Sequence, residues 1–230
     1  SQPVLEFLSQ FFGGIPNSNI DSVFGFLEKS TLYGGRPFLS PELTDADVAQ
    51  LYDAGIGVRL PLSNHYVDQV EYAMNSWLLD KYHRKGNAVI ATNDNLARWI
   101  SEDFPDYTIE SSVIKNINSL EKIHQSLELY DTVVLPMSVN NSPGFLASID
   151  CKERITLFAN AGCALTCPSK ICYPSISKMN KFGGATFQCS KQFKDREQIG
   201  MIDFDLESLI NYGFRRFKLL RGAPGGVTGF

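Results

Sequence analysis

Residues 154–172 read Arg-Ile-Thr-Leu-Phe-Ala-Asn-Ala-Gly-Cys-Ala-Leu-Thr-Cys-Pro-Ser-Lys-Ile-Cys, an apolar run that leads directly into three closely spaced cysteines. The first six residues are rich in apolar and β-branched side chains, which is typical of a strand buried on both faces of a parallel sheet. Cys163, Cys167 and Cys172 follow, and Cys189 comes later in the same region. The stretch therefore predicts a late strand that ends in a cysteine-rich loop.

Strand-like and helix-like segments alternate along the rest of the chain. Strands are predicted at 22–27, 56–62, 87–92, 108–114, 131–136, 154–159 and 215–219, and residues 201–204 form a short apolar segment. Helices are predicted at 42–54, 67–85, 95–103, 119–129 and 205–212, with Asp94 as the cap of the third helix. This order favours βαβ units around a parallel sheet. Because a complete eight-fold barrel usually needs about 250 residues, we predict an α/β fold that forms a compact or incomplete (β/α) TIM-like barrel. An open, doubly wound sheet is the alternative.

The domain organisation and composition are those of an ordinary globular protein. We predict one barrel-like domain over residues 1–222, which includes a cysteine-rich cluster segment at 160–192, and a glycine-rich tail at 223–230. The apolar content of 43%, the charged content of 20% and the net charge of −4 argue against a dedicated nucleic-acid scaffold. No apolar run approaches the length of about 18 residues that a membrane span needs. No basic leader precedes the first apolar stretch, so we expect a cytoplasmic protein without a membrane partner.

The spacing of the cysteines points to a metal centre. Disulfides are disfavoured in a chain without a secretory signal, and thiolates select zinc, copper(I) or iron–sulfur clusters. Zinc sites more often combine two close pairs of cysteines, or cysteines with nearby histidines, and no histidine lies near this segment. We therefore favour a [4Fe–4S] cluster. Structural zinc, disulfides and unrelated buried thiols remain alternatives, and a radical S-adenosylmethionine site is disfavoured by the cysteine gaps. The expected ligands are Cys163, Cys167, Cys172 and Cys189; Cys151, before the strand, is expected to be a plain thiol at the opposite end of the barrel.

Two motifs resemble a known family. The first is Asn160-Ala-Gly-Cys163-x3-Cys167-Pro168 with a later cysteine, and the second is an aspartate-led helix that ends in Tyr212-Gly-Phe-Arg-Arg-Phe-Lys-Leu-Leu-Arg-Gly222. Over roughly residues 150–222 the chain resembles the collagenase-like peptidase family of unknown mechanism, in which a strand of the form G-x-x-x-F/L-K-I-x-G-R follows clustered cysteines.

The resemblance implies a barrel-like fold and a [4Fe–4S] cluster held by four cysteines. Several family members take part in oxygen-independent hydroxylation of transfer RNA, ribosomal RNA or the ubiquinone ring, with prephenate as a proposed oxygen donor. This chain is short and its cysteine gaps differ from those of characterised members, so their substrates are not carried over. The resemblance assigns the four cysteines as ligands, and Lys218 and Arg221 as residues at the mouth of the barrel.

Further candidate site residues lie at or near strand ends, which a barrel gathers around one opening. Arg59 lies inside an apolar strand and should point into a polar barrel interior or pair with a carboxylate. Glu110 and Lys115 either belong to the functional site or form an ion pair with each other near the barrel rim. His65 is either a general base or a histidine at the surface whose hydrogen bonds are already made by the protein. The candidates for catalysis are Arg59, Asn64, His65, Glu110, Lys115, Lys218 and Arg221; Asn160 is a candidate for cofactor binding next to the cysteines.

These expectations favour an enzyme without deciding the matter. The first hypothesis is an iron–sulfur protein that carries out oxygen-independent hydroxylation, or a related redox modification, of a nucleic-acid base or a small metabolite. The alternative is a non-catalytic subunit that is stabilised by zinc or an iron–sulfur cluster and binds a protein partner. Because the barrel is short, a protein partner or a second copy of the chain could complete the site. A peptidase is a third option, for which the sequence places no nucleophile and base.

Overall fold

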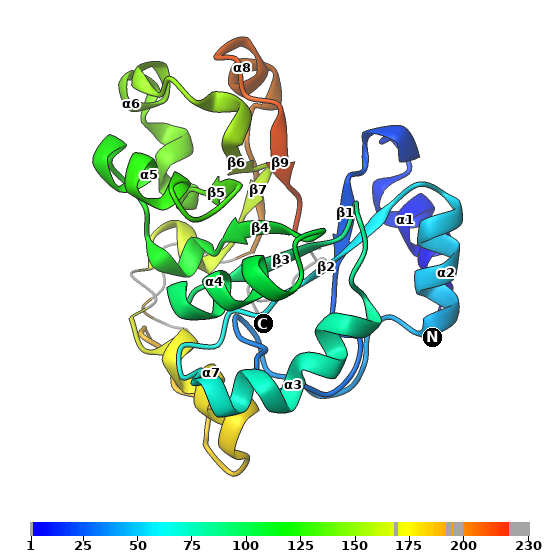
Figure 1. Ribbon diagram of the computed structural model, residues 1–230. Coiled ribbons are helices and arrows are strands. Elements are labelled where there is room, and N and C mark those ends of the chain that lie inside the picture. The colour runs from blue at the N-terminus through cyan, green and yellow to red at the C-terminus, as the bar shows by residue number, and fades with distance from the viewer. Residues whose placement is uncertain (1, 168–169, 192–194, 196–199, 221–230) are drawn as a thin grey trace.

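Parallel strands curl around a common axis in the computed structural model, which describes residues 2–167, 170–191, 195 and 200–220 (Figure 1). Among these residues, seven strands form one sheet in the order β1-β2-β3-β4-β5-β6-β9, and every neighbouring pair is parallel. The strands are β1 (Ser22–Phe24), β2 (Gly57–Leu60), β3 (Ala88–Ala91), β4 (Thr108–Ser111), β5 (Thr132–Val134), β6 (Ile155–Phe158) and β9 (Arg216–Lys218). The predicted incomplete TIM-like barrel is confirmed, and the sequential strand order differs from that of a doubly wound sheet.

Helices surround the curled sheet (Figure 1). They are α1 (Val4–Phe12), α2 (Asp45–Asp53), α3 (Gln69–Lys81), α4 (Asp94–Asp103), α5 (Leu120–Leu127), α6 (Pro143–Ser148), α7 (Cys172–Phe182) and α8 (Leu206–Asn211). Helix α2 contacts β2, α4 contacts β3 and α5 contacts β5. Each of these helices therefore packs on a strand that is its neighbour in the sequence. In the described part of the chain, no helix combines the length and the apolar character that a bilayer crossing requires.

The apolar strand runs form as expected because their side chains are buried on both faces. All four residues of β2, β3 and β6 are buried, and the outward-facing side chains join two apolar clusters under the helices. The predicted cap at Asp94 is wrong. Asn93 caps α4 by accepting hydrogen bonds from the amides of Asn95 and Leu96. The Asp94 carboxylate instead lies 2.6 Å from Lys115 Nζ.

Three regions depart from the expected arrangement. The apolar segment at 201–204, which was not predicted as a strand, contains β8 (Ile202–Asp203), which pairs antiparallel with β7 (Asn160–Ala161) in a separate two-stranded ribbon. The helices α1, α6 and α7 were not predicted, and α7 occupies part of the segment expected to be a loop. The predicted tail at 223–230 lies outside the described residues.

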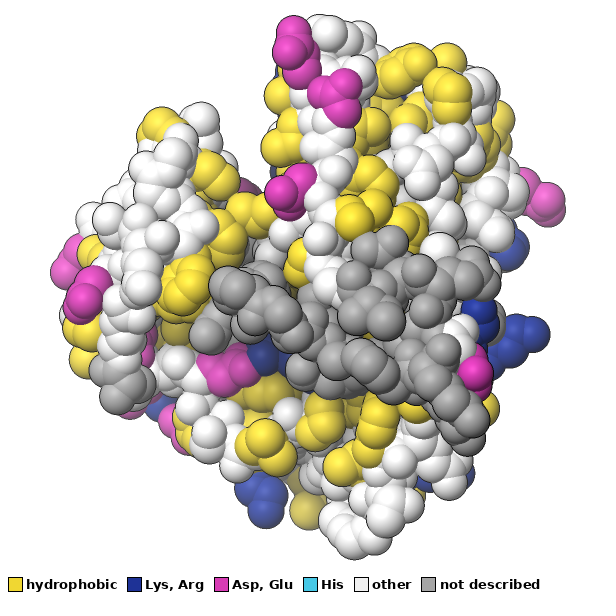
Figure 2. Space-filling view, turned by 180° about the vertical axis from the view of Figure 1, so that it is seen from behind, with side chains coloured by type: hydrophobic (Ala, Val, Ile, Leu, Met, Phe, Trp, Pro, Cys, Tyr) yellow, Lys and Arg dark blue, Asp and Glu magenta, His cyan; other side chains and the backbone are white. Residues whose placement is uncertain are grey.

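The sheet has a seam between its two edge strands, β1 and β9. No backbone pairing joins these strands among the described residues, and the molecular surface is hollowed between the α1–α2 side and the α8 side (Figure 2). Side chains bridge the seam instead. The Asp21 carboxylate, which precedes β1, lies 3.5 Å from Arg216 of β9, and Lys218 Nζ of β9 lies 4.8 Å from the centre of the Phe24 ring of β1. On the other side, the same carboxylate lies 3.0 Å from Arg59 of β2. In the part of the chain that the structure describes, side-chain contacts rather than an eighth strand therefore connect the two edges of the sheet.

Candidate functional site

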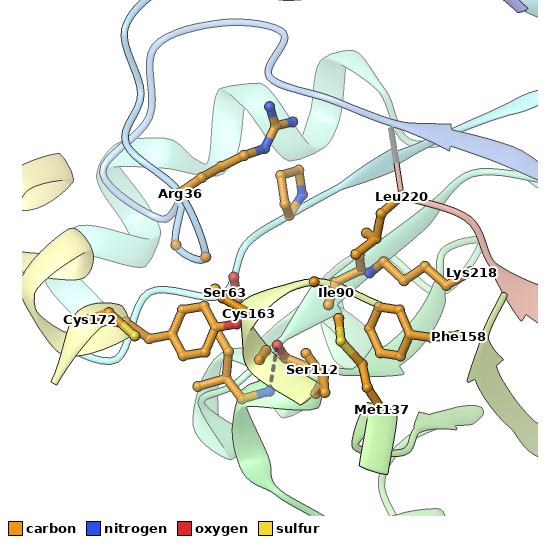
Figure 3. Close-up of a pocket in the computed structure, with 18 of the residues that line it drawn as sticks. Arg36, Ser63, Ile90, Ser112, Met137, Phe158, Cys163, Cys172, Lys218 and Leu220 are labelled. Atoms are coloured by element: carbon orange, nitrogen blue, oxygen red, sulfur yellow. Dashed lines mark hydrogen bonds between the residues drawn. The ribbon is translucent and has the colours of Figure 1, made fainter. Parts of the chain in front are cut away.

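A cavity of about 150 Å³ lies at the carboxyl ends of the barrel strands, beneath the cysteine segment. Its barrel side comes from inward-facing residues at or beyond the strand ends, and its other walls come from the loop at 34–36 and from the cysteine segment (Figure 3). The barrel-side residues are Phe24, Pro61, Ile90, Ser112, Met137, Phe158, Lys218 and Leu220. The cavity is thus mainly apolar, with cationic side chains at its rim, and it occupies the end of the barrel where such folds place their chemistry.

All four cysteines predicted as ligands line this cavity. Cys163 begins the 3-10 turn that follows β7, and Cys172 begins α7 and is buried (Figure 3). Cys167 and Cys189 complete the set of four lining cysteines. Four thiols that converge on one apolar cavity are the donor set that suits an iron–sulfur cluster, and they also suit zinc. The residues present therefore fit the cofactor that the sequence suggests, and the ligand assignment itself stays a prediction.

Asn160 of β7 bonds to the backbone that follows β9 and does not line the cavity. Its Nδ2 donates to the carbonyl of Leu220 at 2.8 Å, and its Oδ1 accepts from the amide of Leu220 at 2.8 Å. Both ends of the side-chain amide are therefore engaged with the backbone that follows β9. These contacts place the start of the cysteine segment relative to the barrel mouth, which is a positioning role and differs from the cofactor contact that we expected.

A second asparagine, which sequence reasoning missed, holds α7 in place. Asn180 Nδ2 donates to the carbonyls of Tyr33 and Arg36, both at 3.0 Å, and its Oδ1 accepts from the amide of Phe38 at 2.8 Å. Helix α7 carries Cys172 at its first residue, so these bonds fix that thiol relative to the loop that forms one wall of the cavity. The only sequence signal is a polar residue inside a helix, which by itself does not name a partner 147 positions away.

Asn64 and His65 also support α7 and do not line the cavity. Asn64 is fully buried, and its Nδ2 donates to the carbonyls of Thr31 and Ser177 at 2.9 Å each. His65 Nδ1 lies 3.1 Å from Ser177 Oγ, and burial lowers the pKa of the imidazole. The His65–Ser177 contact is a poor hydrolytic pair, because Ser177 is fully buried where a substrate cannot reach it.

Arg59 and Glu110 form a buried ion pair inside the barrel, below the cavity. Arg59 Nη1 lies 2.9 Å from Glu110 Oε1, and Glu110 Oε2 accepts from the hydroxyls of Thr132 and Thr156 at 3.1 and 2.8 Å. Burial alone would raise the pKa of Glu110, but Arg59, Lys218 and the two hydroxyls together hold it below the ordinary value. Arg59 thus points inward and pairs with a carboxylate, as the sequence predicts.

Lys115 lies away from the cavity lining, and its predicted pairing with Glu110 is wrong. The ammonium lies 2.6 Å from the Asp94 carboxylate, and Asp94 also accepts a hydrogen bond from Tyr130 Oη at 2.7 Å. The two residues of the predicted pair are separated because Glu110 faces the barrel interior, whereas Lys115 belongs to the turn that follows β4. Arg221 lies outside the described residues.

Lys218 is the candidate catalytic residue that the structure places in the cavity wall. It ends β9, and its side chain lies beside Phe158 and Leu220 at the barrel mouth (Figure 3). Burial lowers the pKa of its ammonium to about 8, with Arg59 and Arg36 acting in the same direction and Glu110 opposing them. A lysine with this pKa exchanges its proton near neutral pH, which is a property that active sites use.

This pKa can be tested by NMR titration of the lysine side chains. One lysine is expected to lose its proton around pH 8, well below the ordinary value for a lysine side chain. The Lys218→Met variant should lack that early titration, and the matched Lys115→Met variant should retain it. An early titration that survives in Lys218→Met, or a wild-type protein without one, would contradict the assignment.

The likeness to a solved structure agrees with this geometry. The chain superposes on the structure of the U32 peptidase Mk0906 with a TM-score of 0.61, covering 88% of this chain and 85% of that chain, at 13% sequence identity. At that identity the likeness shows a shared fold. No protein-family model matches the chain, and no curated protein matches it.

Proposed function

We propose that Cys163, Cys167, Cys172 and Cys189 hold an iron–sulfur cluster, and that the chain uses it in a redox modification of a substrate bound in the adjoining cavity. One observation carries the proposal: all four cysteines line a single cavity at the carboxyl ends of the barrel strands. Zinc with this donor set would be structural, because four protein thiolates leave no open coordination position. A cluster with the same four ligands still exchanges electrons.

The reaction class is proposed from the family resemblance together with the shared fold. The cysteine motif and the Lys218 strand resemble the collagenase-like peptidases, and the superposed structure is that of a U32 peptidase. Within that class we propose oxygen-independent hydroxylation, or a related redox step, on a nucleic-acid base or a small metabolite. Hydroxylation withdraws two electrons from the substrate, so a bound cluster would accept electrons one at a time and pass them to an external electron acceptor, with water as the source of the oxygen atom.

The protein's own residues would prepare the cavity for that step. Phe24, Met137 and Phe158 exclude water from the barrel side of the cavity. Lys218, with its pKa near 8, can donate a proton to a substrate atom or accept one from it at neutral pH. Arg36 lies on the opposite side of the opening, where its guanidinium packs 4.5 Å from the centre of the Phe26 ring and pairs with Glu42 (Figure 3). Because Glu42 offsets the charge of Arg36, the protonated Lys218 is the group that would favour a substrate or intermediate with negative charge.

Peptide hydrolysis, the activity named for the superposed structure, is the second candidate. It needs an accessible nucleophile next to a base. In the described part of the chain, the contact between His65 and a serine hydroxyl involves the fully buried Ser177. The redox proposal therefore has more support from the side chains.

Reduction of anaerobically purified protein separates the proposal from a purely structural zinc. Treatment with dithionite is expected to produce a low-temperature electron paramagnetic resonance signal of a reduced cluster, and reoxidation should remove it. The Lys218→Met variant serves as the control that keeps the four thiols. It should give the same signal while losing turnover of any substrate that wild type modifies. A protein that carries zinc and gives no signal on reduction would refute the redox role.

A further inference from the structure

We propose that His124, Asp150 and Cys151 bind one zinc ion, at a site separate from the four-cysteine cavity. Among the described residues, their ligand atoms all lie within 4.8 Å of one another, and His124 Nε2 is 3.0 Å from Asp150 Oδ1. Ligand atoms around a tetrahedral zinc ion lie roughly 3.3–3.8 Å apart, given metal–ligand distances of about 2.0–2.3 Å. Small side-chain rotations therefore bring the three atoms into a coordination shell.

The position of the three residues separates this site from the cavity. Cys151 and Asp150 precede β6, so they lie at the amino end of that strand, whereas the cavity residue Phe158 lies at its carboxyl end. His124 belongs to α5, which packs on β5. The proposed zinc would thus link a surface helix to the loop that leads into β6, at the end of the barrel where stability rather than catalysis is usually determined.

Arg154 holds the two ligand-bearing segments together without a metal. Its guanidinium donates to the carbonyls of Leu127 and Tyr130 at 3.0 and 2.7 Å, at the end of α5, and to the carbonyl of Asp131 at 2.9 Å. The loop around Cys151 is therefore fixed against the helix that carries His124. A site that exists before the ion arrives loses little conformational entropy on binding.

The donor set selects the ion. One imidazole nitrogen, one carboxylate oxygen and one thiolate sulfur are all ligands that zinc accepts, whereas an iron–sulfur cluster needs several thiolates. Thiolate and carboxylate together carry two negative charges, which balance the charge of Zn²⁺. Binding releases the thiol proton to solvent, and the ring proton of a neutral His124 resides on Nδ1 when Nε2 binds the ion. His124 and Asp150 are exposed, so water can complete the coordination shell.

The neighbouring cations do not oppose an ion at this position. The Arg154 guanidinium is committed to backbone carbonyls, and Lys152 Nζ lies 5.7 Å from the centre of the Phe214 ring. A second His–Asp contact in the protein provides the comparison: His83 Nε2 lies 4.0 Å from Asp106 Oδ2, and neither forms part of a three-ligand group among the described residues. We expect that pair to bind no zinc.

The test is zinc analysis of the full chain with its native metal content, after dialysis against micromolar Zn²⁺. Wild type is expected to retain one zinc equivalent more than Cys151→Ser, and His124→Ala should bind that zinc at least about tenfold more weakly. His83→Ala should match wild type. Co²⁺ added in place of Zn²⁺ should give more thiolate charge-transfer absorption in wild type and His83→Ala than in Cys151→Ser, because the serine variant lacks the Cys151 thiolate.

The difference between variants tests this site whatever the four-cysteine cavity contains. If that cavity binds zinc instead of a cluster, wild type should hold two equivalents and Cys151→Ser one. His124 is exposed, so His124→Ala gives a second readout if the serine variant folds poorly. Equal zinc content in wild type, Cys151→Ser and His124→Ala would overturn the proposal.

Discussion

Cys163→Ser is expected to lower the iron and acid-labile sulfide of the anaerobically reconstituted protein by at least about tenfold. Cys163 is the first of the four cysteines that line the cavity, and it starts the turn directly after β7. A serine hydroxyl is a much poorer ligand for iron than a thiolate, and the cavity contains no spare thiol among its lining residues. The same loss is expected for the corresponding replacements of Cys167, Cys172 and Cys189.

Cys151→Ser is the matched control for this experiment. Cys151 precedes β6 and does not line the cavity, so its replacement should leave the iron and sulfide content unchanged. Equal losses in the two variants would point to general destabilisation. Full retention of the cluster in Cys163→Ser would contradict the ligand assignment.

Glu110→Gln is expected to lower the free energy of unfolding by about 3–5 kcal/mol, because it removes the buried carboxylate of the pair and leaves the Arg59 guanidinium with only the exposed Asp21 carboxylate. The side chains of the pair are only 9% and 2% exposed, so water cannot replace the lost charge. Chemical denaturation of wild type and variant measures the difference. The folded state holds the pKa of Glu110 below its ordinary value of 4.5, so its contribution is present above about pH 4.5 and is lost as the pH falls through the lowered value.

Two further variants separate the buried charge from other effects. Glu28→Gln removes a carboxylate that pairs with Lys81 at the surface, and it should cost no more than about 1 kcal/mol. The double variant Arg59→Met/Glu110→Leu removes both buried charges and should recover much of the stability lost in Glu110→Gln. A double variant less stable than the single one would show that the pair is not the source of the effect.

The barrel could be predicted because its strands are determined locally. Runs such as Ile155–Phe158 are apolar at every position, and the sequence predicts a buried parallel strand wherever such a run occurs. The inward direction of Arg59 follows from the same reasoning, because a charge in an apolar strand needs a partner. The identity of that partner depends on strand order, which placed Glu110 on β4 opposite Arg59 on β2.

The support of the cysteine segment could not be predicted. Helix α7 includes Cys172 and Pro174, and the segment reads locally as a loop. Its position depends on the contacts of Asn64 with Ser177 and of Asn180 with Tyr33, which are separated by 113 and 147 residues. Contacts at that separation become visible only once the barrel has brought the loops after β1, β2 and β7 together.

The sequence located the candidate site most reliably where one residue type, cysteine, recurs within a short region. Four cysteines in one region predicted a shared site, and the structure brings all four to one cavity. Single polar residues were less informative. Asn64, His65, Lys115 and Asn160 each lie near strand ends as expected, yet none of the four lines the cavity, and each is engaged with other protein groups. Lys218 is the exception, because its strand places it in the cavity wall.

Iron and sulfide analysis of anaerobically prepared wild-type protein tests the central claim most directly. A [4Fe–4S] cluster held by the four cavity cysteines predicts about four iron and four sulfide per chain, with brown protein that bleaches on oxidation. Colourless protein that holds zinc in the four-cysteine cavity, without sulfide, would contradict the account.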